Sequence, residues 1–252
     1  MAFHRVQYFS GALGKATAFQ MIFPDPSVPR PYHCMFLLHG LSDDETIWMR
    51  RTSIERYVEG KPLVVVMPDG GRGFYVDADQ GYQYLQALAY ELPSLLSHSY
   101  QIDGQFATAG LSMGGYGALR LALERPDLFK AAVSHSGAVG MGRYFPTPGD
   151  GSKWEAEFIR VFGKVEKGGR NDLIQLASNL KGNPQDSTNR LPALRIDCGT
   201  EDFLLDHNRQ LNRDLTALGI PHEYEEFPGD HNWEYWDQHV QEAIAFCLRN
   251  LS

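Results

Sequence analysis

The chain has 252 residues, of which 43% are hydrophobic and 21% are charged, and its formal net charge is −8. This composition is typical of a soluble globular chain that can bury a large core, and a chain of this length most often forms one domain. We therefore expect a single domain over residues 1–252. The negative charge and the lack of a basic stripe argue against nucleic acid as a partner.

Compartment can be inferred from the cysteines and from the apolar segments. The sequence contains no apolar run of about 18 residues, which a membrane-spanning helix would need, so we expect no membrane partner. Residues 1–6 lack the apolar region of a secretory signal peptide. The three cysteines, Cys34, Cys198 and Cys247, stand far apart in apolar surroundings. That odd number and spacing favour buried, reduced thiols over a disulfide framework, and we predict a cytoplasmic protein.

Apolar stretches predict the strands of a sheet. Residues 3–9 and 15–23 indicate two strands joined as a hairpin at the sheet edge. The runs 32–39 and 63–67 are continuously apolar, which is typical of strands buried on both faces of a parallel sheet. Further strands are expected over residues 104–109, 130–136, 191–199 and 224–227.

Helical spacing of apolar residues occurs between these strands. A long amphipathic helix is expected over residues 81–98, with a kink at Pro93. The carboxylates of residues 43–45 are expected at the positive end of a short helix that runs through Trp48. Strands that alternate with helices in this way indicate an α/β fold with a mostly parallel central sheet and helices on both faces. The remaining helices are expected over residues 53–59, 113–125, 171–179, 204–218 and 232–249, with Asn232 as the cap of the last.

Residues 138–190 depart from this regular pattern. Glycines, prolines and aromatic residues alternate there with weak helical segments. An insertion of this size is typical of a cap that covers a site. A solvent-facing excursion with a small core of its own is the alternative.

Residues 110–114 form the pattern G-x-S-x-G between a predicted strand and a predicted helix. In such a nucleophile elbow, the serine adopts a strained backbone conformation that projects its hydroxyl from the sheet edge. Glycines flank it because neighbouring segments pass too close for a side chain. The sequence therefore predicts Ser112 as a nucleophile, whereas a glycine-rich turn that merely starts a helix is the structural alternative.

A nucleophilic serine needs a histidine base, and the histidine needs a carboxylate that orients it. In α/β-hydrolases both follow the serine, the acid first, each on a loop after a strand. Asp202 and His231 directly follow the last two predicted strands, so we predict a triad of Ser112, Asp202 and His231. The competing residues are less well placed: Asp206 and His239 in predicted helices, Glu201 pointing away, His222 at the opposite edge, and His135 as a structural histidine or a pocket wall.

An acyl-transfer site also needs backbone N–H groups that stabilise the oxyanion. One is expected from Met113, the residue after the nucleophile, and the other from Leu41, which follows the turn at Gly40. A simple turn at the end of the strand is the alternative for residues 39–40. Five aromatic residues are candidates for lining the substrate pocket, with a core position as the alternative for each: Trp48, Phe74, Tyr75, Trp154 and Trp233.

Motifs for metal or phosphate binding are not found. The sequence has no paired-histidine zinc motif, no cysteine pair and no calcium loop. Residues 70–73 are rich in glycine but lack the lysine and hydroxyl of a phosphate-binding loop. We therefore predict neither a metal nor another cofactor.

Five segments together resemble the esterase D family of α/β-hydrolases: residues 39–41, 67–71, 110–118, 198–202 and 229–233. Within that family the chain is most similar to the short tributyrin-esterase type of carboxylesterase. The likeness spans the chain from the first buried strand to the last helix and is weakest over residues 138–190.

The resemblance implies an α/β-hydrolase fold and a serine carboxylesterase that cleaves short acyl esters, which are small molecules, through an acyl-enzyme intermediate and without a cofactor. S-formylglutathione hydrolases are relatives within the family, and that activity is the alternative function. A non-catalytic α/β-hydrolase that only binds a ligand is a third hypothesis. Members of the family often self-associate, so a homo-oligomer is plausible.

Overall fold

The computed structural model describes residues 1–100, 102–145, 154–182 and 190–251. Its centre is an eight-stranded sheet with the strand order β1-β2-β4-β3-β5-β6-β7-β8. The hairpin β1–β2 is antiparallel, as is the β2–β4 pair, and all other neighbours are parallel. The bounds are Ala2–Ser10 (β1), Lys15–Phe23 (β2), Tyr32–Leu38 (β3), Leu63–Pro68 (β4), Ile102–Leu111 (β5), Phe129–His135 (β6), Ala193–Gly199 (β7) and Glu223–Phe227 (β8).

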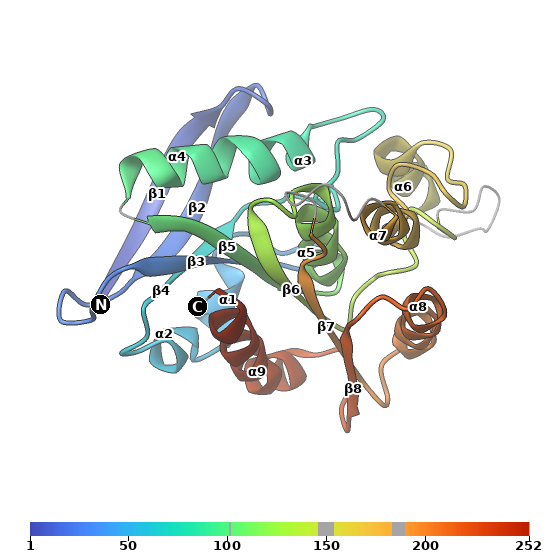
Figure 1. Cartoon of the computed structure of the whole chain (residues 1–252). Helices are drawn as coiled ribbons and strands as arrows, with labels where there is room; N and C mark the ends of the chain where they lie inside the picture. Colours follow the sequence, from blue (N-terminus) through green and yellow to red (C-terminus); the bar gives the residue numbers. More distant parts are fainter. Residues whose placement is uncertain (101, 146–153, 183–189, 252) are drawn as a thin grey trace.

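Helices cover both faces of this sheet, which confirms the predicted α/β architecture (Figure 1). Among the described helices, none combines the length and the hydrophobicity that a transmembrane segment requires. The bounds are Ile47–Arg51 (α1), Ile54–Tyr57 (α2), Tyr84–Gln86 (α3), Ala87–Glu91 (η1), Leu92–Ser99 (α4), Met113–Glu124 (α5), Glu155–Phe162 (α6), Leu173–Lys181 (α7), Leu205–Ala217 (α8) and Trp233–Leu251 (α9).

The continuous apolar run of β3 serves two separate cores. Cys34 and Phe36 belong to the hydrophobic cluster that includes side chains of α4 and α5. Met35 and Leu37 belong to the cluster that includes side chains of α9. Successive side chains of a strand point to opposite faces, so a central strand needs apolar residues at every position.

Two local predictions differ from the structure. The short helix begins later than expected, at Ile47, so residues 43–45 precede α1 and its first turn contains no acidic residue; Asp44 accepts hydrogen bonds from the Thr46 backbone and side chain. In place of a simple kink at Pro93, the π-helical segment η1 precedes this proline. Proline has no backbone N–H that could donate to the carbonyl four residues earlier. That carbonyl belongs to Ala89, and it accepts a hydrogen bond from the Arg125 guanidinium instead.

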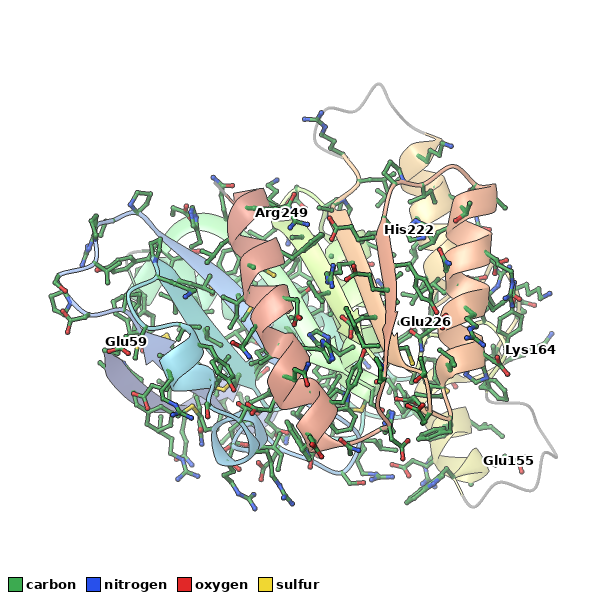
Figure 2. The ribbon with its side chains drawn as sticks, turned by 90° about the horizontal axis from the view of Figure 1, so that it is seen from below. Glu59, Glu155, Lys164, His222, Glu226 and Arg249 are labelled. Atoms are coloured by element: carbon green, nitrogen blue, oxygen red, sulfur yellow. The ribbon has the colours of Figure 1, made fainter. Side chains whose placement is uncertain are left out.

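The outer strand β8 is protected by charged side chains. Glu223 pairs with Arg195 and Arg249, and Glu226 pairs with Arg209. Figure 2 shows Arg249 on α9, the helix that crosses this face of the sheet, and Glu226 on the strand. Charged residues on an edge strand discourage its pairing with a strand of another molecule.

The described part of residues 138–190 packs onto the main core through aromatic rings. Phe158 and Phe162 of α6 contact Phe74, with ring centroids 5.3 and 5.2 Å apart. Phe162 also contacts Tyr116 of α5, with centroids 5.9 Å apart. This segment therefore extends the core on the α5 face of the sheet.

Replacing Gly110 with alanine tests the close packing at the end of β5. A methyl group there would collide with the carbonyl group of Gly114 and lie 2.9 Å from Leu38 Cβ. We expect Gly110→Ala to lower the free energy of unfolding by about 1–3 kcal/mol, because backbone atoms cannot move aside cheaply. Gly11→Ala is the control, since its methyl group would meet only Glu91 Oε1 at 3.7 Å. Equal stability of both variants in urea denaturation would contradict this account.

Candidate active site

Ser112 lies at the sharp turn between β5 and α5. Its backbone angles, φ 53° and ψ −114°, are uncommon for any residue other than glycine. Hydrogen bonds hold this turn: the Ser112 N–H donates to the His135 carbonyl at 2.9 Å, and the Ser112 carbonyl accepts from Tyr116 and Ala138 at 3.1 and 2.9 Å. The strained residue is thus fixed at the carboxyl edge of the sheet.

Gly114 allows the start of α5 to approach the end of β3. A methyl group on Gly114 would collide with the Leu38 carbonyl and would lie 2.6 Å from the His39 carbonyl oxygen. The close approach brings the loop after β3 against the nucleophile turn. This explains in steric terms why glycine occupies the last position of the G-x-S-x-G pattern.

The loops after β7 and β8 bring Asp202 and His231 to Ser112. His231 Nε2 lies 3.1 Å from Ser112 Oγ, and His231 Nδ1 lies 2.8 Å from Asp202 Oδ2. Because the carboxylate accepts at Nδ1, the ring hydrogen is on Nδ1 and Nε2 is left to accept the hydroxyl hydrogen. The structure thus brings the three residues into the order hydroxyl, imidazole, carboxylate.

The environment of Asp202 keeps its side chain ionised. Burial by itself raises the pKa of the Asp202 carboxyl, but hydrogen bonds from His231 and from the Leu204 N–H outweigh it, so the pKa is lowered below its ordinary value. A carboxylate in this position orients the imidazole and stabilises its protonated form.

The loops after β7 and β8 are bonded to each other. The Glu201 N–H donates to the Gly229 carbonyl at 2.9 Å, and the Glu201 carboxylate accepts from the Gly229 N–H at 2.7 Å. Gly199 has no room for a side chain, because a methyl group would collide with that carbonyl. Glu201, one of the competing acids, therefore fixes the loops and does not face the histidine.

The other residues considered as the base or the acid have partners other than Ser112 Oγ. His135 is buried, and its Nδ1 contacts both carboxylate oxygens of Asp197 at 2.9 Å. This second histidine–aspartate pair, whose acid lies inside a strand, was not predicted from the sequence. Asp206 is exposed and lies near Arg209 on the same helix. The two remaining histidines have other partners: His222 contacts Asn212, and His239 stacks on Phe227.

The predicted oxyanion donors lie on the two segments that meet at Ser112. Gly40 is close to the nucleophile, because a Cβ on it would lie 3.8 Å from Ser112 Cβ. The Leu41 N–H has no acceptor within the described part of the chain. Met113 opens α5, and the first N–H groups of a helix have no acceptor inside it. Neither N–H therefore has an acceptor among the described residues, as an oxyanion donor requires.

Two aromatic residues proposed for the pocket instead support the loop after β3. Trp48 and Tyr75 are 1% and 0% exposed and Phe74 is likewise buried, which favours the core position that was the alternative for each. Trp48 Nε1 donates to the Leu38 carbonyl at 3.1 Å, and Tyr75 Oη donates to the His39 carbonyl at 2.9 Å. Carbonyl groups beyond the end of a strand have lost their ladder partners, and these side chains replace them.

Arg72, which was not predicted as a site residue from the sequence, joins three parts of the site rim. Its guanidinium pairs with Glu157 of α6, with Nη2 and Oε2 2.8 Å apart, and donates to Ser42 Oγ at 2.7 Å. It also lies 4.7 Å from the ring centroid of Trp154, a predicted pocket residue that is 36% exposed. Trp233, the last predicted pocket residue, is half-buried against Trp48, and for these two the pocket role stays a prediction.

Two further rings flank the His231 imidazole. The ring of Phe203 lies 4.6 Å from it, and the ring of Trp236 lies 4.9 Å from it at nearly a right angle. Phe203 is 74% exposed. Its position directly after Asp202 was the only signal in the sequence that could have placed it at the site.

These features define the class of protein. A hydroxyl, an imidazole and a carboxylate in series at the carboxyl edge of a parallel sheet form the arrangement of serine hydrolases with the α/β-hydrolase fold. Within the described ranges, no group of three histidine, cysteine or acidic side chains is placed to hold a metal ion.

The chain belongs to the Esterase family, whose model matches residues 10–247. It is 27% identical over 267 residues to an acetyl esterase of Caldicellulosiruptor saccharolyticus, with 99% of both chains covered. Two Staphylococcus aureus structures are each 30% identical with 98% of both chains covered: the substrate-bound fluorophosphonate-binding serine hydrolase F (TM-score 0.84) and the S-formylglutathione hydrolase FrmB (TM-score 0.82). The predicted α/β-hydrolase fold and carboxylic ester hydrolase class are confirmed.

The supporting role of Tyr75 beside the loop after β3 can be tested with Tyr75→Phe. The change leaves the His39 carbonyl unpaired, so we expect a loss of about 1–3 kcal/mol in unfolding free energy. Because it displaces the loop after β3, kcat/KM should fall by the same factor for p-nitrophenyl acetate, butyrate and hexanoate. Tyr32→Phe is the matched control, since its buried hydroxyl donates to Val28 far from the site. A loss that grows with acyl length would instead place Tyr75 in the pocket wall.

Proposed function

We propose that this chain hydrolyses short-chain acyl esters through an acyl-enzyme on Ser112. The observation that carries this proposal is the contact of His231 with both Ser112 Oγ at 3.1 Å and Asp202 Oδ2 at 2.8 Å. A base within this distance of a hydroxyl can accept its proton as the oxygen attacks a carbonyl carbon.

In the first half-reaction, Ser112 Oγ bonds to the ester carbonyl carbon while its proton passes to His231 Nε2. The carbonyl oxygen becomes an oxyanion that accepts hydrogen bonds from the Leu41 and Met113 N–H groups. When the tetrahedral intermediate collapses, the bond to the alcohol oxygen breaks, and that oxygen takes the proton from His231. Asp202 stabilises the imidazolium in between.

In the second half-reaction, water takes the place of the departed alcohol. His231 Nε2 accepts a proton from the water as its oxygen bonds to the acyl carbon. The oxyanion is again held by the two amides, and collapse returns the proton to Ser112 Oγ and releases the carboxylic acid. The enzyme is thereby regenerated without any cofactor.

S-formylglutathione hydrolysis is the alternative function, and a structure similar to this chain carries that name. Glutathione carries two carboxylates, which need cationic partners in a binding site. Arg72 at the site rim is already paired with Glu157, which favours uncharged esters. Comparing kcat/KM for S-formylglutathione and for tributyrin distinguishes the two substrates.

Finer features are part of the same proposal. We assign the chain to the tributyrin-esterase type and residues 138–190 to a cap within a single domain. The contacts of Phe158 and Phe162 with the main core support a cap that is fixed to the domain. A cytoplasmic location is supported by the three cysteines, which are free and buried.

Covalent labelling tests the nucleophile directly. We expect the wild-type chain to react with a fluorophosphonate probe and Ser112→Ala not to react, because the variant has no hydroxyl at the elbow. Hydrolysis of p-nitrophenyl acetate should be lost in parallel. Ser27→Ala, which removes a surface hydroxyl bonded to Asp25, should be labelled like the wild type. Labelling of Ser112→Ala at the wild-type rate would exclude Ser112 as the nucleophile.

Asp202→Asn tests the carboxylate. The amide no longer fixes the tautomer of His231, so kcat should fall by about 10⁴-fold with little change in KM. The lowered pKa means that ionised Asp202 stabilises the fold above the ordinary carboxyl pKa of about 4 and that this contribution is lost as pH falls below it. The stability gap between wild type and variant should therefore narrow on acidification. Asp206→Asn, at an exposed position, is the control; an equal loss of kcat in both variants would refute the assignment.

A further inference from the structure

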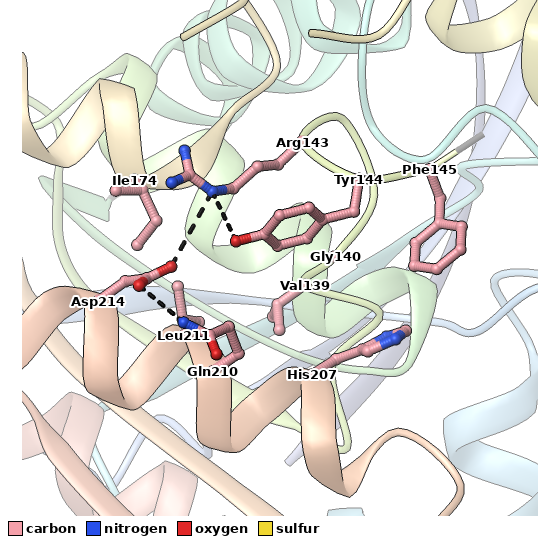
Figure 3. A pocket seen from close by; sticks show the side chains of 10 residues that line it. All are labelled: Val139, Gly140, Arg143, Tyr144, Phe145, Ile174, His207, Gln210, Leu211 and Asp214. Carbon is pink, nitrogen blue, oxygen red and sulfur yellow. Dashed lines mark hydrogen bonds and ion pairs between the residues drawn. The ribbon is translucent and has the colours of Figure 1, made fainter. Parts of the chain in front are cut away.

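A cavity of about 240 Å³ lies between α7, α8 and the segment that follows β6 (Figure 3). This volume is below the roughly 300–1,000 Å³ of drug-sized ligand sites, so the cavity has room for one ring-sized group. Its walls are mainly apolar, with polar side-chain atoms on His207, Gln210 and Asp214 of α8 and on Arg143 and Tyr144. The residues that matter here are Val139, Phe145, Ile174, His207, Gln210 and Leu211.

The charges around the cavity are already paired with each other. Arg143 bonds to the buried Asp172 and lies 3.9 Å from Asp214. Gln210 Nε2 donates to Asp214 Oδ1 at 2.8 Å, and Figure 3 shows the contacts of Asp214 with Arg143 and Gln210 at one end of the cavity. A charged ligand would have to displace one of these pairs, so the walls favour an uncharged group.

The opposite end of the cavity carries two rings. His207 and Phe145 have ring centroids 5.2 Å apart. The His207 imidazole makes no hydrogen bond within the described part of the chain. Burial lowers the pKa of His207, and only Asp206 opposes this shift, so the ring is neutral at pH 7. This end therefore offers an aromatic surface and one neutral polar ring.

Two walls of the cavity adjoin residues of the catalytic centre along the chain. On one side, Val139 follows Ala138, whose N–H bonds to the Ser112 carbonyl. On the other side, α8 begins three residues after Asp202, and His207 lies in its first turn. The cavity is thus built from the same two segments that hold the nucleophile turn and the acid.

Phe203 lies between the acid and α8, and its exposure calls for an explanation. It is 74% exposed, yet its ring contacts the His231 ring in a tilted arrangement with centroids 4.6 Å apart. Fully burying a phenylalanine side chain is worth about 1.5–3 kcal/mol, a gain that this ring obtains only when a ligand covers it. His231 delivers its proton to the departing alcohol, so the group next to Phe203 is the alcohol portion of the ester.

We propose that Phe203 and the cavity form a subsite for the alcohol portion of the substrate, and that the preferred alcohol is an uncharged one carrying an aromatic ring on a short chain. The ring lies in the cavity against Phe145 and His207, and the connecting chain passes over Phe203. This inference rests on the esterase reaction proposed above, since it assigns one half of that substrate.

The test compares two esters that share an acyl group, propyl acetate and 3-phenylpropyl acetate. We expect Gln210→Trp, which fills the cavity from α8, to lower kcat/KM for 3-phenylpropyl acetate by about tenfold, mainly through KM, and to leave propyl acetate unchanged. Thr216→Trp, on an exposed position of α8 that does not line the cavity, is the matched control and should change neither. Phe203→Ala should lower the preference of the enzyme for the phenyl ester over the propyl ester.

The outcomes separate this inference from the proposed function. If Gln210→Trp and Phe203→Ala both leave the ratio of the two kcat/KM values at the wild-type level, the subsite is refuted while ester hydrolysis stands. If the wild-type chain hydrolyses neither ester and is not labelled by a fluorophosphonate, the proposed function itself fails. Labelling of Gln210→Trp at the wild-type rate shows that the variant is folded, so a selective loss on the phenyl ester supports the subsite.

Discussion

The contact between the His231 imidazole and the Ser112 hydroxyl depends on the register of four parallel strands. Leu111 pairs with His135, His135 with Asp197, and Asp197 with Glu225, so β5, β6, β7 and β8 share one row of residues near their carboxyl ends. Ser112 comes one residue after Leu111 of that row. Asp202 comes five residues after Asp197, and His231 comes six residues after Glu225. A register slip of one residue would turn side chains to the opposite face of the sheet. Side chains far apart in the sequence meet because the strands end at one level.

The strained turn at Ser112 is stable because hydrogen bonds from neighbouring segments fix its backbone conformation. A non-glycine residue with positive φ costs about 1–3 kcal/mol, and such strain persists only where the surroundings fix it. Here the backbone of Ser112 bonds to His135 on the adjacent strand and to Ala138 beyond it. On the other side, Trp48 and Tyr75 hold the carbonyl groups of the loop after β3. The result is a hydroxyl that does not need to reorganise when it meets a carbonyl carbon.

The sequence was informative where chemistry and chain geometry impose a single solution. Buried parallel strands require unbroken apolar runs, and loops after such strands carry the polar groups, so the strands and the candidate residues Ser112, Asp202 and His231 could be located. It was less informative where one residue type serves two purposes. An aromatic residue near a strand end has the same pattern whether it lines a pocket or donates to a carbonyl, so the sequence could not predict the hydrogen bond of Trp48 to Leu38. Arg72 and Phe203 act through contacts between distant loops, and no spacing of residues along the chain indicates such contacts.

The sheet order also fixes how an ester must lie in the site. The Leu41 amide comes from the loop after β3, on one side of the nucleophile strand, whereas His231 comes from the loop after β8, on the other side. A substrate whose carbonyl oxygen faces the first loop must direct its alcohol oxygen toward the second, because the same imidazole has to protonate it. The alcohol therefore leaves on the side of β7 and β8, where Phe203 and the start of α8 are the exposed surface, and the acyl group stays with Ser112. This division explains how one loop cluster can govern the choice of alcohol without altering the acyl-transfer chemistry.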